Sequence, residues 1–303
     1  MLRVSTIRSV PVAVANWLGV TGRDERPVGR ILLYHGTPRR HAAALERQLR
    51  WLKRRFSVVP LRSVVAAAHN GGNVGSKVAL TFDDGLRSNV DVAYPILHKL
   101  ALPATFFVCP GLVDRAGWLW THETRRRLAR LAGEARRELA AELNAPAESE
   151  AFVEWMKTLD LAARRRVESR LSDATPGFVP SAQERDDFDL AGWSELRRLD
   201  PALVSIGSHS LTHAILPGTP PDEMEVEVRD SRRRLEDGLE RPVDVFAYPN
   251  GNYDASTETC VRRHYRAAVT AARGWVRRGT DAHLLPRLVA PTGVLRLARR
   301  VYA

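Results

Sequence analysis

The sequence predicts an α/β protein whose mostly parallel sheet is either open or closed into a barrel. Seven short apolar runs, rich in β-branched and aromatic residues, are typical of buried strands. Stretches with helical periodicity separate most of these runs, and strands that alternate with helices predict parallel pairing. The 303 residues are enough for one large domain with a substantial core, or for two ordinary ones.

The alternation begins after a polar link at residues 21–30. The expected strands are residues 31–35, 58–59, 77–82, 103–108, 204–207, 243–248 and 267–270. The expected helices between and after them are residues 41–56, 61–69, 91–100, 221–240, 255–264 and 294–303. Asp254 is expected to cap the fifth of these helices. The last helix carries three arginines, and we expect it to be solvated, with contact to anionic lipid as the alternative.

This rhythm stops between about residues 114 and 199, where Arg, Glu, Ala and Leu dominate. We expect helices at 123–143 and 150–171, separated by a break at residues 144–146. The block is too long for a crossover loop, so we expect a helical insertion that lies over one end of the sheet domain. It contains four tryptophans, which we interpret first as packing residues and second as stacking platforms for sugar rings: Trp118, Trp120, Trp155 and Trp193.

The charge and cysteine content narrow the possible partners. The net charge is +11, but the arginines are scattered and form no dense basic block with interleaved aromatic residues. No zinc finger, RNA-recognition signature or bZIP-like basic region is present, so we expect no nucleic-acid partner. Cys109 and Cys260 are too few for a disulfide framework and lie in apolar contexts, so we expect buried free thiols.

The first residues are interpreted as an extension, residues 1–27, that precedes a single domain of residues 28–303. Residues 10–20 are mildly apolar but too short to span a bilayer, and Arg8 interrupts the run that a cleaved leader would need. We therefore expect a cytoplasmic protein with peripheral contact to the inner face of the membrane. The oligomeric state is left open.

The strand at residues 77–82 ends in Asp83-Asp84-Gly85. Adjacent residues that leave a strand point in different directions, so the two carboxylates can have different tasks. One can ligate a metal while the other takes a proton from a water at that metal. Taken alone, the pair is better explained as a strand-to-helix turn in which Asp83 is a cap.

Two further segments favour the metal site. His209 and His213 follow another strand, and at i and i+4 on a helical turn both imidazoles lie on one face. Two imidazoles and one carboxylate form a three-ligand set with open positions, for which Zn²⁺ is the first choice and Co²⁺, Ni²⁺ or Fe²⁺ are alternatives. The tight turn within residues 246–253 can present a backbone N–H to an oxyanion.

These three segments, in this order, resemble the NodB-homology polysaccharide deacetylases of carbohydrate esterase family 4. The resemblance covers about residues 28–288, interrupted by the helical insertion, and implies a distorted, incomplete (β/α)7 barrel. It also implies metal-dependent hydrolysis of an N-acetyl group on a sugar. Carried over, the metal ligands are Asp84, His209 and His213, the general base is Asp83, and the oxyanion donor is the backbone N–H of Asn250. The expected substrate contacts are Tyr248, Pro249 and Leu285.

The sequence departs from the family pattern at two positions. Ala247 stands where many members have an arginine paired with the catalytic base. Residues 284–287, Leu-Leu-Pro-Arg, stand where many have a general-acid histidine. The N-terminal Tyr34-His35 resembles the rearranged, exopolysaccharide-associated members, which implies that His35 is the acid and that Arg287 replaces the missing arginine. Histidines without a partner pattern, among them His122, receive no role.

The sequence therefore predicts a metal-dependent deacetylase that acts on an N-acetylated polysaccharide or lipid-linked saccharide. A deformylase or amidase with a non-polymeric substrate is the second hypothesis, because the same site would serve it. A saccharide-binding protein that has lost catalysis is the third, supported only by the two departures. The sugar, the acyl group and the physiological metal are left open.

Overall fold

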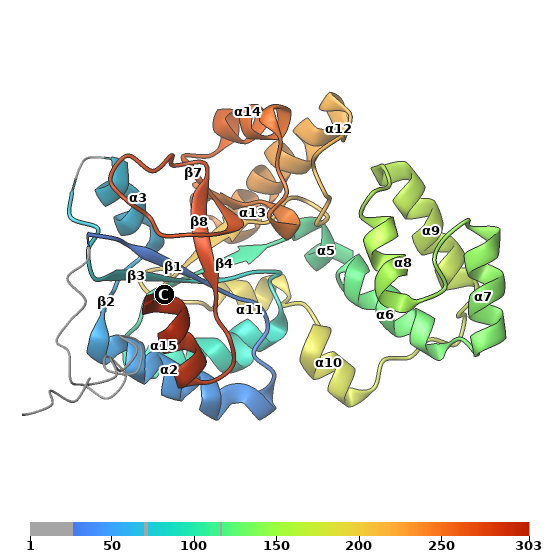
Figure 1. Cartoon of the computed structure of the whole chain (residues 1–303), viewed down its shortest axis with the longest axis horizontal. Coiled ribbons are helices and arrows are strands. Elements are labelled where there is room, and N and C mark those ends of the chain that lie inside the picture. Colours follow the sequence, from blue (N-terminus) through green and yellow to red (C-terminus); the bar gives the residue numbers. More distant parts are fainter. Residues whose placement is uncertain (1–26, 70–71, 116, 303) are drawn as a thin grey trace, which may run out of the picture.

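The computed structural model describes residues 27–69, 72–115 and 117–302, and within them the strands form a parallel barrel (Figure 1). Seven of the eight described strands pair in a closed ring, β1-β3-β4-β5-β6-β7-β8, and β1 pairs with both β3 and β8. This arrangement confirms the predicted (β/α)7 class. The strands are β1 (Arg30–Tyr34), β2 (Ser57–Val58), β3 (Lys77–Phe82), β4 (Ala104–Val108), β5 (Val204–Ser208), β6 (Val245–Ala247), β7 (Ala267–Arg273) and β8 (Leu285–Val289).

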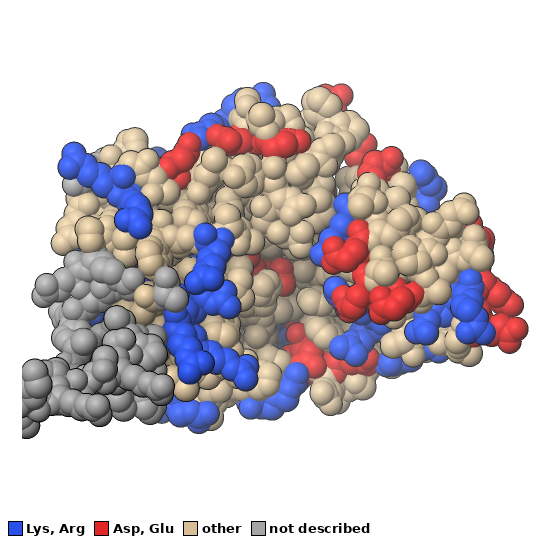
Figure 2. Space-filling model, viewed as in Figure 1, with Lys and Arg blue, Asp and Glu red and all other residues tan. Residues whose placement is uncertain are grey.

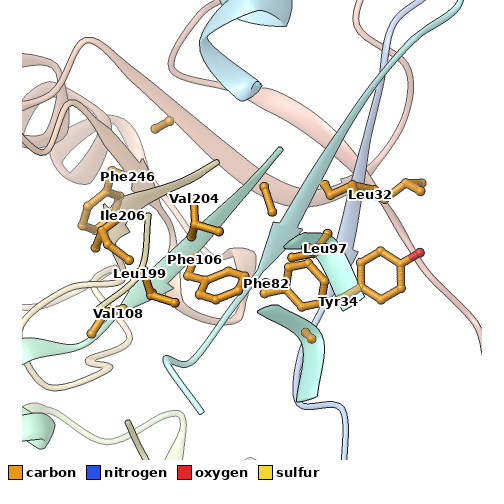
Figure 3. Packing of buried hydrophobic residues seen from close by; sticks show 14 of the residues in the cluster. Leu32, Tyr34, Phe82, Leu97, Phe106, Val108, Leu199, Val204, Ile206 and Phe246 are labelled. Carbon is orange, nitrogen blue, oxygen red and sulfur yellow. The ribbon is translucent and has the colours of Figure 1, made fainter. Parts of the chain in front are cut away.

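The strands are buried on both faces, as parallel strands covered by helices are. Every residue of β1 and β4 is buried. Alternate side chains join different clusters: Leu32 and Tyr34 pack with the helices outside the ring, whereas Ile31 packs with residues of the barrel interior. In the outer cluster the rings of Tyr34 and Phe82 stack with centroids 4.9 Å apart, and Phe106 follows in the same row (Figure 3).

Helices cover the ring in chain order. They are α2 (Ala42–Arg55), α3 (Leu61–His69), η2 (Asn89–Ala93), α4 (Tyr94–Leu100), α12 (Pro221–Glu225), η3 (Val226–Asp230), α13 (Ser231–Leu239), α14 (Ala255–His264) and α15 (Val294–Tyr302), with two short turns, η1 (Arg39–His41) and η4 (Pro249–Gly251). As expected, Asp254 caps α14, and its carboxylate accepts a hydrogen bond of 2.8 Å from Thr257 N.

The C-terminal helix α15 is not fully solvated, contrary to expectation. It buries four residues, Leu297, Ala298, Val301 and Tyr302, and packs against α2. The buried side chain of Arg30 donates from Nε to the Val301 carbonyl at 2.8 Å. The apolar residues recur at helical spacing, so one face joins the core while Arg296 and Arg299 remain exposed.

A group of helices lies between β4 and β5, where we expect the helical insertion, and most of it stands beside the barrel (Figure 1). They are α5 (Pro110–Arg115), α6 (Trp120–Arg130), α7 (Gly133–Glu142), α8 (Ser149–Met156), α9 (Leu161–Asp173), α10 (Ala182–Phe188) and α11 (Trp193–Arg197). Each of the two long helices expected here is divided in two, at residues 131–132 and 157–160. The helices α6, α7, α8 and α9 share a small core of their own around Leu128, Phe152 and Met156.

The strand β8 was missing from the predicted set. Its sequence, Leu-Pro-Arg-Leu-Val, holds a proline and an arginine that break the apolar pattern. The ring therefore contains β8, whereas the expected strand at residues 58–59 corresponds to β2, which pairs only with the start of β3. Both cysteines are free and buried, as predicted.

Membrane contact and cellular location stay predictions. Across residues 27–69, 72–115 and 117–302, no helix is both long and apolar enough to cross a bilayer. The expected extension at residues 1–27 lies, except for its last residue, outside the described residues.

Replacing Gly207 tests the packing of the barrel interior. An added Cβ would lie 2.5 Å from the Phe107 ring and 2.9 Å from Val245 Cγ2. We expect Gly207→Ala to lower the free energy of unfolding by about 1–3 kcal/mol, because the neighbours must leave their rotamers. Urea denaturation measures this, with Gly177→Ala as a control whose added Cβ meets nothing within 4 Å. Equal stability of the two variants would contradict the close packing.

Candidate active site

A cavity of 290 Å³ lies at the carboxyl ends of the strands, between the barrel and the insertion. Figure 2 shows the corresponding hollow between these two parts of the surface. The carboxyl ends of the strands carry the sites of parallel barrels because the βα loops meet there. The cavity is lined by Leu33, His35, Asp83, Asp84, Leu119, Thr121, His122, Arg125, Lys157, His209, His213, Tyr248, Asn250, Gly251, Ala271, Arg287 and Val289.

The three expected metal ligands, Asp84, His209 and His213, lie together in a compact group. Their ligand atoms all lie within 4.8 Å of one another, and Oδ1 of Asp84 is 3.6 Å from Nε2 of each histidine. All three residues are buried. Asp84 has a φ of 74° and Gly85 a φ of 65°, so the chain turns sharply after β3 and directs the carboxylate into the cavity.

The two histidines do not lie on a helical turn, which corrects the expected local geometry. The segment after β5 is an irregular loop in which Ser210 and His213 adopt left-handed conformations with φ of 60° and 56°. These two residues bring the imidazoles together, with ring centroids 4.9 Å apart. The residue spacing therefore predicted correctly that the two imidazoles lie together, but the backbone that brings them together is a loop and not a helical turn.

The hydrogen bonds and pKa shifts in this group are compatible with a bound cation. Nδ1 of His209 lies 2.8 Å from the Ala247 carbonyl, which can only accept, so Nδ1 carries a proton and Nε2 is left facing Asp84. Burial raises the pKa of Asp84, but the electrostatic influence of its neighbours, His35 first among them, outweighs this and lowers it overall. Burial and the neighbouring His209 lower the pKa of His213 to about 3. A buried carboxylate and two imidazoles thus converge, which is a donor set for one divalent cation.

Asp83 is held by a buried arginine, Arg287. The guanidinium donates to both carboxylate oxygens, from Nη1 to Oδ1 at 2.7 Å and from Nη2 to Oδ2 at 2.8 Å. Its remaining hydrogen bonds are with Thr81 Oγ1 at 3.2 Å and the Thr270 carbonyl at 2.7 Å. Burial raises the pKa of Asp83, but the positive charge of Arg287 outweighs this and lowers it overall. Asp83 is therefore ionised and fixed beside Asp84.

Two histidines outside the ligand group also face the cavity. His35 is exposed where the chain leaves β1, and it lines the cavity. His122 comes from α6 in the insertion: its Nε2 is 4.0 Å from Asp84 Oδ2, and its ring stacks on Phe188 with centroids 4.6 Å apart. Nothing in the sequence signalled His122, because it lies outside the three motif segments.

The segment after β6 contributes Tyr248 and Asn250 to the cavity. Asn250 is left-handed, with a φ of 57°, and its Oδ1 accepts from Lys157 Nζ at 3.3 Å. The other two expected substrate contacts do not reach the cavity. Pro249 is buried in the turn, and Leu285 is fully buried among residues of the barrel interior.

The insertion forms one wall of the cavity with Leu119, Thr121, His122, Arg125 and Lys157. It also supports the loop from His209 to His213, which we call the ligand loop, because the Trp120 indole donates to the His213 carbonyl at 3.1 Å. Trp118 and Trp120 are both buried, in agreement with their interpretation as packing residues.

Removing Arg287 tests the ion pair. We expect Arg287→Met to lower the free energy of unfolding by about 3–5 kcal/mol, because Asp83 is left buried without its counter-charge. The double variant Asp83→Asn/Arg287→Met should lose less free energy of unfolding than Arg287→Met alone, since no buried charge remains to be compensated. Denaturation of the metal-free protein measures both. Arg233→Met, whose native side chain is 78% exposed, is the control. Equal losses in the single and double variants would exclude a coupled pair.

Comparisons with known proteins agree with this geometry. The profile of the family described as "Polysaccharide deacetylase" matches residues 71–268. A search of curated proteins finds no match.

Among solved structures, IcaB from Ammonifex degensii superposes with a TM-score of 0.62 at 18% identity, covering 93% of this chain and all of the other. The deacetylase PplD of Streptococcus pyogenes, solved with acetate, gives 0.60 at 19%, covering 90% and 97%. The deacetylase domain of BpsB from Bordetella bronchiseptica gives 0.56 at 15%, covering 88% and 97%. At these identities the superpositions establish the fold alone.

Proposed function

The chain belongs to the polysaccharide deacetylase family, and from that membership we propose that it is a metal-dependent N-deacetylase whose site is the cavity described above. Family membership gives the reaction, hydrolysis of an acetyl amide on a saccharide. The proposed metal dependence and the location of the site are supported by the buried group of Asp84, His209 and His213, which lies directly beside the ion-paired Asp83.

Asp84, His209 and His213 are the residues that would hold the cation. A divalent cation bound there supplies Lewis-acid polarisation of the acyl carbonyl and lowers the pKa of water. Zn²⁺ is our first choice because one carboxylate and two imidazoles with open positions suit it, while Co²⁺, Ni²⁺ and Fe²⁺ accept the same ligands.

Asp83 is proposed as the general base. Its carboxylate is ionised, and both oxygens are held by Arg287, so its position is fixed relative to the ligands. It accepts the proton of the attacking water. Arg287 thereby takes the part of the arginine that is absent at Ala247, whose carbonyl instead orients His209.

The remaining two roles go to His35 and Asn250. His35 follows β1 at the cavity edge and is proposed to protonate the leaving amine, as in the rearranged members of the family. The backbone N–H of Asn250, in the turn after β6, is proposed to donate to the oxyanion. Both residues line the cavity.

The proposed substrate is an N-acetylated sugar within a polysaccharide or a lipid-linked saccharide. IcaB, PplD and BpsB share the fold, and PplD and BpsB are named as deacetylases. A deformylase or amidase would use the same groups and differ only in the acyl substrate. A binding protein without catalysis has little support, because base, counter-charge and ligand group are all assembled.

Metal reconstitution tests the proposed function. Metal-stripped protein should release acetate from N-acetylglucosamine oligomers only after Zn²⁺, Co²⁺ or Ni²⁺ is restored. Asp83→Asn should lower kcat by about 10²–10⁴-fold and still bind one metal ion per chain, because the general base is lost and the ligands are not. Asp237→Asn, at a carboxylate that is 75% exposed, should behave like the unaltered protein. Metal-independent release would refute the mechanism, and metal binding without release would leave another acyl substrate or a binding role.

The identity of the general acid is tested with two histidine variants. His35→Ala should reduce kcat by about 10²–10⁴-fold with metal bound, because the leaving amine then departs unprotonated. His122→Ala, the matched change at the other histidine facing the cavity, should affect kcat far less. Acetate release and metal content are measured for both. The opposite order of effects would move the acid role to His122 in the insertion.

A further inference from the structure

The loop from His209 to His213 needs support from outside itself. It is irregular, and two of its residues, Ser210 and His213, hold left-handed conformations that cost energy in residues other than glycine. Such a conformation persists only when surrounding contacts fix it. Both ligand histidines depend on it for their positions.

Contacts of this kind come from a helical run that begins at Pro221, eight residues after His213. α12, η3 and α13 form one continuous run, and η3 is a π-helical turn in its middle. A π-turn carries an extra residue and leaves backbone carbonyls available to other donors, and such turns are frequent at functional sites. Here the Glu227 carbonyl accepts from Leu211 N at 3.0 Å, and the Val228 carbonyl accepts from Tyr265 at 3.0 Å.

The side chain of Glu227 makes two more contacts with the same loop. Its Oε2 accepts from Thr212 N at 2.9 Å and its Oε1 from Thr212 Oγ1 at 2.6 Å. Glu227 is 2% exposed, so this carboxylate is withdrawn from water. A buried carboxylate is costly unless its oxygens are hydrogen-bonded, and Thr212 satisfies both of them. Leu211 and Thr212, the residues that Glu227 holds, lie between the two ligand histidines.

We propose that Glu227 is a positioning residue that shapes the metal-ligand loop before the metal binds. It touches neither the ligand atoms nor the cavity, and it acts through Leu211 and Thr212. The inference rests on the proposed function in that it takes His209 and His213 as ligands. Outer contacts of this kind set the geometry of ligands and thereby metal affinity.

Hydrogen exchange in the metal-free protein tests the positioning directly. In the unaltered protein the amides of Leu211 and Thr212 should be protected, because both donate to Glu227. In Glu227→Ala the exchange of Thr212 should accelerate strongly and that of Leu211 should follow as the loop loosens. The control is Glu223→Ala, the same change at an exposed position of the same helical run. Unchanged exchange in Glu227→Ala would overturn the proposal.

Metal affinity provides the second readout. Glu227→Ala should weaken Zn²⁺ binding by about 10–100-fold, the range typical for outer partners of metal ligands. Glu227→Gln should stay close to the unaltered affinity, because its carbonyl can accept from Thr212 N while its amide donates to Thr212 Oγ1. Affinity in Glu227→Gln as low as in Glu227→Ala would show that charge is what matters, and would overturn positioning by hydrogen bonds.

Two milder substitutions, at Thr212, test the proposal even if Glu227→Ala fails to fold. Thr212→Val removes one donor and keeps the shape, whereas Thr212→Ser keeps both donors. We expect weaker Zn²⁺ binding only in the valine variant, and equal affinities would contradict the proposal. Failure of this proposal can be distinguished from failure of the proposed function. Hydrogen exchange at Leu211 and Thr212 shows whether Glu227 holds the loop, whether or not the protein is active. Absent acetate release by the unaltered protein would count against the proposed function only.

Discussion

The buried pair of Asp83 and Arg287 is the interaction on which the site depends. Two charges withdrawn from water are tolerable only with close, fully hydrogen-bonded geometry, and here each carboxylate oxygen and each guanidinium nitrogen has a partner. Arg287 lies over the Phe107 ring in the barrel interior, 5.7 Å from its centroid, and thus closes the floor of the cavity. Asp83 and the layer of barrel side chains that contains Arg287 and Phe107 therefore form one structural unit.

The ligand loop is supported from two sides by separate parts of the chain. The π-turn at η3 contacts its middle through Glu227, and Trp120 of the insertion contacts the His213 carbonyl. A third contact, from the Ala247 carbonyl, orients His209. The proposed metal site would need such contacts, because three side chains alone do not fix their own directions.

The sequence predicted what local pattern controls. The apolar strand that ends in Asp83-Asp84, the paired histidines after another strand and the tight turn at Asn250 each follow from residue type and spacing, and parallel topology brings strand ends together. The sequence did not reveal the features that depend on tertiary contacts. β8 was hidden because Pro286 and the buried Arg287 look polar and irregular until the ion pair explains them. His122 and Lys157 were missed because no local pattern reports which wall an insertion presents.

The closure of the ring has a consequence for how the site is assembled. His35 follows the first strand of the ring and Arg287 lies in the last, and β1 and β8 pair directly at the seam. Asp83 and Arg287 are separated by 204 residues, so Asp83 acquires its counter-charge only when the last strand docks. During synthesis Asp83 leaves the ribosome long before its partner, and contacts of such long range form late and slowly. Completion of the barrel and completion of the proposed catalytic centre are therefore the same folding event.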